Sequence, residues 1–216
     1  MLSQGGYVLI ADDHPLTREG LALAARAAMP GVAPISAGTV EQAEQALASR
    51  RAVRLILLDF VLPDSNGYSG FMRLQMASRS SRIVIVSGRE EVGLIEAARA
   101  LGAAGFIFKS DPLDNIAEKV RRIDAGASIF PSEGSPDPVI QAARQKIANL
   151  SPSQLKVLVA LADGRLNKQI AADLDITEAT VKAHLTAIFR KLGVTNRTQA
   201  LLAVQPLIGN GGLTLQ

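Results

Sequence analysis

The chain has no cysteine and only two histidines in 216 residues. The absence of cysteine excludes disulfides, thiolate metal sites and cysteine nucleophiles, and it agrees with a reducing compartment. No uninterrupted apolar stretch approaches the roughly 20 residues that are needed to cross a bilayer, and the first residues do not resemble a signal peptide. We therefore expect a cytoplasmic protein that has no membrane partner.

The composition predicts two small globular domains. With 48% hydrophobic and 20% charged residues, the chain is too apolar to be disordered, and its length suits two ordinary domains. The net charge of +3 is unevenly distributed, because residues 150–216 carry seven basic and four acidic side chains while the two signs balance in residues 1–149. A basic C-terminal part suits a polyanionic partner such as DNA.

Apolar segments alternate with helical ones through the first 125 residues. Strands are predicted at residues 7–11, 35–37, 55–59, 83–87 and 105–109. Helices are predicted at about residues 16–28, 39–49, 70–77, 90–101 and 112–124. Because parallel neighbours need crossover connections, five strands alternating with five helices predict an α/β domain with a five-stranded, doubly wound parallel sheet.

The C-terminal part shows helices and no strand. A segment rich in proline, glycine and serine at residues 132–138 marks a linker, and a helical stretch at 139–148 extends it. We therefore predict a first domain at residues 1–126, a partly helical linker at 127–149 and a small all-α domain at 150–216. Its four helices are predicted at Pro152–Ala162, 168–174, Glu178–Leu192 and about 198–204, with Asn167 and Thr177 as the N-caps of the second and third.

Acidic, hydroxyl and basic residues stand at the predicted carboxyl ends of four strands. Asp12 and Asp13 follow the first strand, and Asp59 ends the third, whose continuous apolar run is typical of a central buried strand. Ser87 and Lys109 end the fourth and fifth strands. Because ligands in open α/β sheets gather at the carboxyl ends of the strands, these residues should meet at one rim. Three adjacent carboxylates repel unless a cation joins them, and such hard oxygen ligands suit Mg²⁺ held together with phosphate oxygens.

Each of these residues also has an ordinary explanation when it is taken alone. An Asp-Asp pair at a strand end is usually a helix cap or a solvated turn, and a single serine or lysine is unremarkable. The order of the five positions on the strand ends makes a shared site the better interpretation. His14 keeps its ordinary explanation, because it stands beside Pro15 in a predicted loop with no second histidine or cysteine nearby to build a transition-metal site.

The acidic site resembles that of the receiver domain of two-component response regulators, and the resemblance covers about residues 7–125. It implies a flavodoxin-like fold in which a sensor histidine kinase transfers a phosphoryl group to Asp59. It implies no enzymatic turnover beyond this self-catalysed transfer and a slow dephosphorylation. It also implies that Asp13, Asp59 and the backbone carbonyl of Val61 ligate Mg²⁺, while Asp12 acts mainly through water.

The same resemblance assigns a switch pair and a lysine. Ser87 is the switch hydroxyl, and Lys109 is the receiver lysine. Phe106 stands at the aromatic switch position, where the family often has a tyrosine, so a hydroxyl is missing here. Pro63 and Gly67 match the turn after the phosphoacceptor.

The predicted helices from residue 168 to residue 192 have the lengths and caps of a helix-turn-helix. On the longer helix, one face is apolar and suits a core, with Val181, Leu185, Ile188 and Leu192. The opposite face is small, polar and basic, which suits close approach to the major groove of DNA. An ordinary amphipathic helix in a small bundle explains the periodicity alone equally well.

The residues themselves resemble the LuxR-type DNA-binding domain over about residues 150–204, through segments 166–171, 180–185 and 191–198. Together with the receiver, the chain is similar to the NarL/FixJ group of response regulators. The resemblance implies base contacts from Lys182, Ala183 and Thr186, and phosphate contacts from Lys168, Thr180 and Arg197. A homodimer would bind two half-sites of double-stranded DNA, and the last helix offers Ala200, Leu201 and Val204 for pairing. At the domain entry, Ser151 and Gln154 stand where the family usually has threonine and glutamate.

Both motif sets in one chain predict a phosphorylation-dependent transcriptional regulator in which phosphorylation of Asp59 shifts dimerisation and DNA binding. An alternative is a regulator that binds DNA irrespective of phosphorylation and uses the receiver as a dimerisation platform. A hydrolase of the haloacid dehalogenase type is disfavoured, because Val61 stands where that family has its general acid. A dinucleotide-binding domain is disfavoured because the turn after the first strand has no glycine-rich loop.

Overall fold

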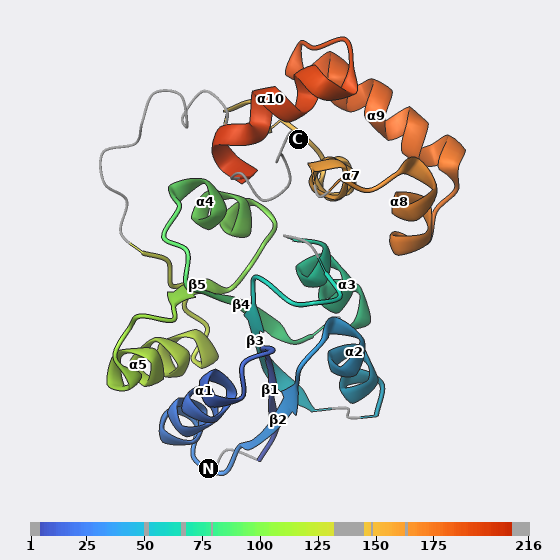
Figure 1. The fold of residues 1–216 in the computed structure, drawn as a ribbon. Coiled ribbons are helices and arrows are strands. Elements are labelled where there is room, and N and C mark those ends of the chain that lie inside the picture. The colour runs from blue at the N-terminus through green and yellow to red at the C-terminus, as the bar shows by residue number, and fades with distance from the viewer. Residues whose placement is uncertain are drawn as a thin grey trace. The chain divides into compact units, whose positions relative to one another are not determined.

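The computed structural model describes residues 5–49, 52–65, 68–78, 80–131, 145–147, 149–162 and 164–208. The chain divides into two compact units, one from the first 131 residues without residues 91–101, and one dominated by the residues after 131 (Figure 1). The predicted linker at 132–138, Gly67 and most of the predicted helix at 139–148 lie outside the described residues. Within the described part of the chain, no helix is long and apolar enough to span a membrane.

The first unit is built on five parallel strands in the order β2-β1-β3-β4-β5. The strands are β1 (Tyr7–Ala11), β2 (Ala33–Ala37), β3 (Val53–Asp59), β4 (Arg82–Ser87) and β5 (Gly105–Phe108). The predicted doubly wound parallel sheet is therefore confirmed. β3 is central, and its apolar residues are almost fully buried, which explains why its sequence shows no alternation of polar and apolar residues.

Helices cover both faces of this sheet. They are α1 (Pro15–Ala28), α2 (Val40–Ser49), α3 (Ser69–Ala77) and α5 (Leu113–Asp124), while α4 (Val92–Ala100) lies between β4 and β5 in the chain. α1 and α5 pack against each other on one face, where alternate strand residues such as Val8, Leu57 and Val86 join their apolar sides in one core. α2 and α3 pack against each other on the other face (Figure 1).

The strand order places the carboxyl ends of β1 and β3 side by side. The chain leaves β1 to form β2 on one side of it, and then returns to form β3 on the other side. The register pairs Ala11 with Leu58, so the residues that follow β1 reach the level at which β3 ends. This reversal of direction is the place where open α/β sheets leave a crevice for ligands.

The body of the first unit extends beyond the predicted boundary at residue 126. After Gly126, which has a φ of +104°, Ile129 pairs with Gly105 as an isolated parallel bridge on the outer edge of β5. The N–H of Phe106 donates to the carbonyl of Ile129 at 2.9 Å, and the N–H of Ile129 donates to the carbonyl of Ala104 at 3.2 Å. Ile129, which lies in the stretch predicted to begin the linker, pairs with the edge of the sheet and satisfies backbone groups that an edge strand otherwise leaves unpaired.

The second unit contains four described helices after residue 149, as predicted: α7 (Pro152–Ala162), α8 (Asn167–Asp173), α9 (Glu178–Leu192) and α10 (Arg197–Ile208). Thr177 caps α9 as predicted, accepting a hydrogen bond from the N–H of Thr180 at 3.1 Å. The predicted N-cap at Asn167 is wrong, because Leu166 occupies that position with its N–H held by the Gln169 side chain at 2.9 Å. The apolar faces of the four helices meet in one small core.

The turn between α8 and α9 contains the only described residue other than glycine with a positive φ. Asp175 has a φ of 52°, and the N–H of Ile176 donates to the carbonyl of Ala171 at 3.0 Å across the end of α8. This is the backbone conformation in which glycine usually ends a helix. Asp175 therefore carries a local steric cost that sets the direction in which α9 begins.

Candidate functional site

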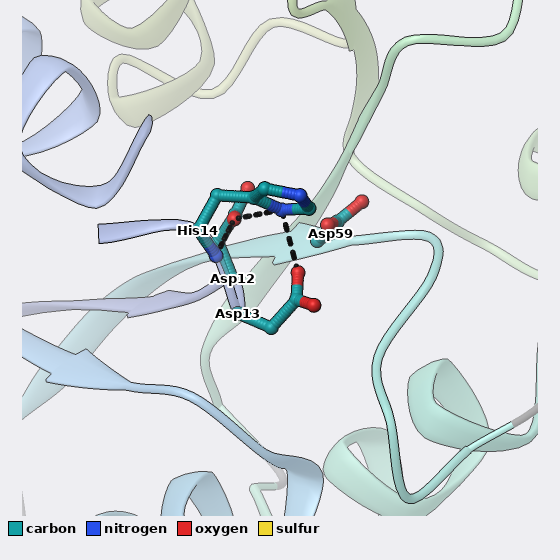
Figure 2. Close-up of side chains that lie close together, drawn as sticks. All are labelled: Asp12, Asp13, His14 and Asp59. Atoms are coloured by element: carbon teal, nitrogen blue, oxygen red, sulfur yellow. Dashed lines mark hydrogen bonds and ion pairs between the residues drawn. The ribbon is translucent and has the colours of Figure 1, made fainter. Parts of the chain in front are cut away.

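Three carboxylates converge at the carboxyl ends of β1 and β3. Asp12 and Asp13 lie in the turn between β1 and α1, Asp59 is the last residue of β3, and Figure 2 shows all three together with His14. One ligand atom from each of the four side chains lies within 4.8 Å of the others. Asp12 is fully buried and Asp59 is 5% exposed. The structure brings these aspartates together as predicted, because the order of the strands places the ends of β1 and β3 side by side.

Lys109 joins two of the three carboxylates. It follows β5, and its Nζ donates to Oδ2 of Asp59 at 2.7 Å and lies 2.7 Å from Oδ2 of Asp12. Burial raises the pKa of Asp59 above its ordinary value, and the hydrogen bond and charge of Lys109 offset only part of this effect. Burial alone would lower the pKa of Lys109, but its hydrogen bonds to Asp12 and Asp59 outweigh burial and raise that pKa. The ammonium therefore stays charged and compensates carboxylates that are otherwise costly to bury.

The donor set fits a hard divalent cation. Oδ2 of the buried Asp12 makes no hydrogen bond within the described residues beyond its ion pair with Lys109, so it retains acceptor capacity. Oδ1 of Asp59 accepts only weakly from the N–H of Val61, at 3.2 Å. Three carboxylates with unused oxygen lone pairs match the preference of Mg²⁺ for oxygen ligands, and a single ammonium leaves negative charge at the site for a cation to neutralise.

The predicted switch pair consists of two buried side chains. Ser87 is 1% exposed, and its Oγ accepts a hydrogen bond from the N–H of Arg89 at 3.0 Å. Phe106 is fully buried and packs edge-on against Phe108, with ring centroids 5.7 Å apart. The backbone carbonyl of Ser87 also accepts from the N–H of Lys109 at 2.8 Å, so the ends of β4 and β5 are tied together beside the acidic cluster.

The loop after Asp59 is fastened by the carboxylate of Asp64, whose role no local pattern in the sequence indicates. Oδ1 and Oδ2 of Asp64 accept the N–H groups of Val40 and Glu41, each at 2.9 Å, and so cap the start of α2. A cap supplied by a residue more than twenty positions away leaves no local signal. Asp64 connects the segment that follows Asp59 to α2, which restricts how that segment can move.

The predicted DNA-reading face of α9 is exposed. Lys182, Ala183 and Thr186 are exposed, while Val181 and Leu185 on the other face are buried. The hydroxyl of Thr186 donates to the carbonyl of Lys182 at 3.0 Å, one turn earlier in the same helix. Its methyl group and its oxygen lone pairs are therefore the parts that remain for contact with a base.

The predicted phosphate contacts occupy different environments. Lys168 is exposed at the start of α8, and Thr180 is half-buried with its hydroxyl 2.9 Å from that of Thr177. Nη2 of Arg197 instead donates to the carbonyls of Leu161 and Arg165, at 3.1 and 3.0 Å. Burial lowers the pKa of Arg197. In this structure Arg197 satisfies the carbonyls at the end of α7, a role that its position in the sequence does not reveal.

The predicted pairing residues of α10 are mostly inward-facing. Ala200 and Val204 are fully buried, and Leu201 is half-buried, so the two buried side chains are not available for pairing in this structure. Among the residues of α10 whose burial the structure describes, Leu202 is a large apolar residue that is exposed, at 56%. Pairing of two copies through α10 stays a prediction.

The start of α7, where Ser151 and Gln154 differ from the usual residues of the family, still has a complete helix cap. The N–H of Ser151 donates to Oε1 of Gln154 at 3.0 Å, and the N–H of Gln154 donates to Oγ of Ser151 at 3.3 Å. Nζ of Lys191 donates to the same Oε1 at 2.8 Å. The capping expected of Ser151 is therefore present, and a neutral amide takes the place of the glutamate that would have formed an ion pair.

Known families and proteins resemble this chain over most of its length. The response regulator receiver domain matches residues 8–121, and the bacterial regulatory proteins of the luxR family match residues 148–204. The glycerol metabolism activator of Pseudomonas putida is 35% identical over 206 residues, which cover 91% of this chain and 93% of that protein. The nitrate/nitrite response regulator protein NarL of Escherichia coli (strain K12) is 30% identical over 207 residues, which cover 91% and 94%.

Solved structures show the same architecture. The RcsB response regulator of Salmonella typhimurium superposes with a TM-score of 0.59 over 95% of this chain and 99% of its own, at 19% identity, so it supports the fold alone. A LuxR family DNA-binding response regulator from Silicibacter pomeroyi is 35% identical, with a TM-score of 0.51, and covers 59% of this chain and 98% of its own.

Proposed function

The chain belongs to the response regulators that combine a receiver domain with a LuxR-type DNA-binding domain, and we propose that phosphorylation of Asp59 controls its action on transcription. The phosphoryl donor is a sensor histidine kinase, and the output is binding of a homodimer to double-stranded DNA. The receiver extends to about residue 131, and the DNA-binding domain begins at about residue 150. A cytoplasmic location is part of this proposal.

The observation that carries the proposal is the state of Asp59. Its carboxylate ends the central strand, is almost fully buried, and faces Lys109 and two further carboxylates. An aspartate with only a structural role would be better compensated, whereas this cluster carries three carboxylates for one ammonium. Such a concentration of negative charge favours the binding of a cation, which can in turn hold the oxygens of a phosphoryl group.

The chemistry follows from the side chains present. One Oδ of Asp59 attacks the phosphorus of phosphohistidine, the O–P bond forms as the N–P bond breaks, and the histidine of the kinase leaves. Lys109 is placed to hold a phosphoryl oxygen in exchange for part of its contact with Asp59. Asp12, Asp13, Asp59 and the Val61 carbonyl would hold Mg²⁺, which when bound neutralises charge on the phosphoryl oxygens.

The switch and the output use the residues described above. Ser87 and Phe106 rearrange when the phosphoryl group arrives, because the hydroxyl of Ser87 gains a new acceptor beside Asp59. Phosphorylation then biases a pre-existing equilibrium between two states of the protein. In the DNA-binding state, Lys182, Ala183 and Thr186 face the bases of the major groove, and Lys168 and Thr180 contact phosphates.

A titration of the full-length protein tests the proposal. Wild type and Asp59→Asn are incubated with acetyl phosphate and Mg²⁺, and intact-mass spectrometry measures the phosphorylated fraction. DNA selected from a random library is then used to compare affinities with and without beryllofluoride. We expect a phosphoryl adduct only on the wild type, and tighter DNA binding when the beryllofluoride complex forms. If the DNA affinity is the same with and without beryllofluoride, the chain is a phosphorylation-independent regulator.

A further inference from the structure

His14 lies among the carboxylates of the acidic site. Its Nδ1 is 2.7 Å from Oδ1 of Asp13 and 3.4 Å from Oδ1 of Asp12. Its backbone N–H donates to the same oxygen of Asp12 at 2.7 Å, which fixes the turn that carries the side chain. Figure 2 shows the imidazole reaching from this turn toward Asp59. The sequence around His14 does not indicate a metal site, because no second histidine stands nearby. One of its neighbours in space, Asp59, comes from the end of a different strand.

The position of His14 suits metal ligation better than a structural role. Its side chain is 66% exposed, so it contributes little to the core, yet its ring nitrogen lies within 4.8 Å of a ligand oxygen of each of the three aspartates. In this structure Nδ1 of His14 donates to Oδ1 of Asp13 at 2.7 Å. A bound cation would take the place of that proton, with the remaining ring proton on Nε2 and the Nδ1 lone pair directed at the metal. The backbone hydrogen bond between His14 and Asp12 keeps that nitrogen near the cluster.

A nitrogen ligand changes which cations the site prefers. Mg²⁺ takes oxygen ligands and gains nothing from an imidazole. Co²⁺, Ni²⁺ and Zn²⁺ bind imidazole readily, and they bind mixed nitrogen and oxygen sites more tightly than Mg²⁺ does. Lys109 contacts Oδ2 of Asp12 and Oδ2 of Asp59, whereas His14 lies near Oδ1 of Asp12 and Oδ1 of Asp13. The two side chains therefore use different carboxylate oxygens.

We propose that His14 is a ligand of the receiver's cation site, which lets the site bind borderline first-row transition ions through one nitrogen and the carboxylates of Asp13 and Asp59. This inference rests on the proposed function for the existence of the cation site, and it adds a ligand and a class of metal to it. Mg²⁺ binds the same carboxylates without the imidazole. The two classes of cation therefore compete for one site but depend differently on His14.

Metal titration of the full-length protein distinguishes ligation from simple positioning of Asp13. Calorimetric affinities for Co²⁺ and Mg²⁺ are compared between the wild type, His14→Asn and His184→Asn, the last being the matched control at the other histidine of the chain. We expect His14→Asn to lose about tenfold or more in Co²⁺ affinity, while its Mg²⁺ affinity changes by less than about twofold because Mg²⁺ uses oxygens. Equal losses for both ions would show that His14 only positions Asp13 and would overturn the proposal.

A spectroscopic measurement identifies the ligand directly. A histidine bound to paramagnetic Co²⁺ gives a strongly shifted proton resonance from its remaining ring N–H, and this resonance disappears in D₂O. Because the chain has only two histidines and no cysteine, the assignment needs two variants. The resonance should be present in wild type and His184→Asn and absent in His14→Asn; its persistence in His14→Asn would overturn the proposal. A wild type that binds Co²⁺ through His14 but forms no phosphoryl adduct would instead contradict the proposed function alone.

Discussion

Nζ of Lys109 donates a 2.7 Å hydrogen bond to Oδ2 of Asp59, a carboxylate that is only 5% exposed. The side chain of Lys109 is 21% exposed, and its ammonium compensates the buried carboxylate of Asp59. Removing one partner of a buried ion pair leaves the other charge without compensation, which costs more than the pair contributes as a whole. The stability of the receiver and its proposed chemistry therefore depend on the same contact.

Replacement of Lys109 by methionine should destabilise the receiver. We expect Lys109→Met to lower the free energy of unfolding by about 3 kcal/mol, because the buried carboxylates lose their ammonium. Urea unfolding followed by circular dichroism measures this change. Added Mg²⁺ should restore part of the loss, because a cation can take over the compensation of charge.

Lys119 provides the matched control for Lys109. Its Nζ also lies 2.7 Å from a carboxylate, Oδ2 of Asp111, but both side chains are partly exposed, at 27% and 18%. Lys119→Met should therefore cost less than about 1 kcal/mol and should not respond to Mg²⁺. A loss as large as that of Lys109→Met would show that burial is not what makes the Lys109 contact important.

The raised pKa of Asp59 predicts a pH dependence of stability. A carboxyl with a raised pKa in the folded protein binds its proton more tightly than in the unfolded chain, so its contribution is fully present below its ordinary pKa of 3.8 and is lost as the pH rises through the folded pKa. Asp59→Asn does not titrate. We expect this variant to be more stable than the wild type at pH 7, by about 1 kcal/mol, and the difference to shrink as the pH falls toward 4.

Chemical unfolding of both proteins across this pH range measures the difference. The asparagine oxygen can still accept a hydrogen bond from Lys109, so the variant removes the charge while it keeps the shape. A difference in stability that does not change between pH 4 and pH 7 would contradict the expected titration of Asp59.

Gly105 is required for the sheet edge that Ile129 completes. A Cβ built at Gly105 would lie 2.6 Å from the carbonyl oxygen of Ile129 and 2.8 Å from Cδ1 of Ile123. Gly105→Ala should therefore release the bridge and cost about 1–3 kcal/mol, with faster amide exchange at Phe106. Thermal unfolding and hydrogen exchange measure the two effects.

Gly20, within α1, is the control for Gly105. Its added Cβ would meet only Cδ2 of Leu113, at an ordinary 3.6 Å. Gly20→Ala should stabilise the protein by about 0.5–1 kcal/mol, because alanine loses less conformational entropy in a helix. If Gly105→Ala and Gly20→Ala both destabilise the protein, the loss at Gly105 cannot be attributed to its close contact with Ile129.

Replacement of Asp175 by glycine should stabilise the DNA-binding unit. Its φ of 52° lies in the left-handed region, which costs an ordinary residue about 1 kcal/mol and costs glycine little. Asp175→Gly should raise the stability of the DNA-binding unit by up to about 1 kcal/mol. Gly193→Ala, at a φ of 70°, is the reverse substitution and should lower it. Melting curves of both variants test the pair, and a loss of stability in Asp175→Gly would contradict the steric argument.

Lys168 should contribute to DNA affinity without contributing to stability. It is exposed near the start of α8, and we propose that it contacts a phosphate. Lys168→Ala should weaken binding to selected DNA and reduce the slope of log affinity against log salt by about one, because one phosphate is no longer neutralised. The melting temperature should stay unchanged. Arg26→Ala, which removes one exposed positive charge from α1 of the receiver, should leave the salt slope as it was and so excludes a general effect of net charge.

Local signals in the sequence are enough to predict the architecture. Alternating apolar and helical segments located all five strands of the sheet, and the capping residue Thr177 marked the start of α9. The same signals predict which residues gather at the acidic site, since parallel strands bring their carboxyl ends to one rim. Asp12, Asp13, Asp59 and Lys109 therefore followed from the strand ends alone.

Tertiary packing selects the partner that each side chain takes. The sequence suggested Ala200 and Val204 as pairing residues, but only the structure shows that both are buried. Only the structure shows that Arg197 donates to the carbonyl of Leu161 in α7 and to that of Arg165 after it. Asp64 caps a distant helix, and Ile129 completes β5, through contacts across many residues. The pairing of β1 with β3 brings Asp59 close to His14. Each of these contacts is formed by residues that are close in space, and no local pattern in the sequence records that proximity.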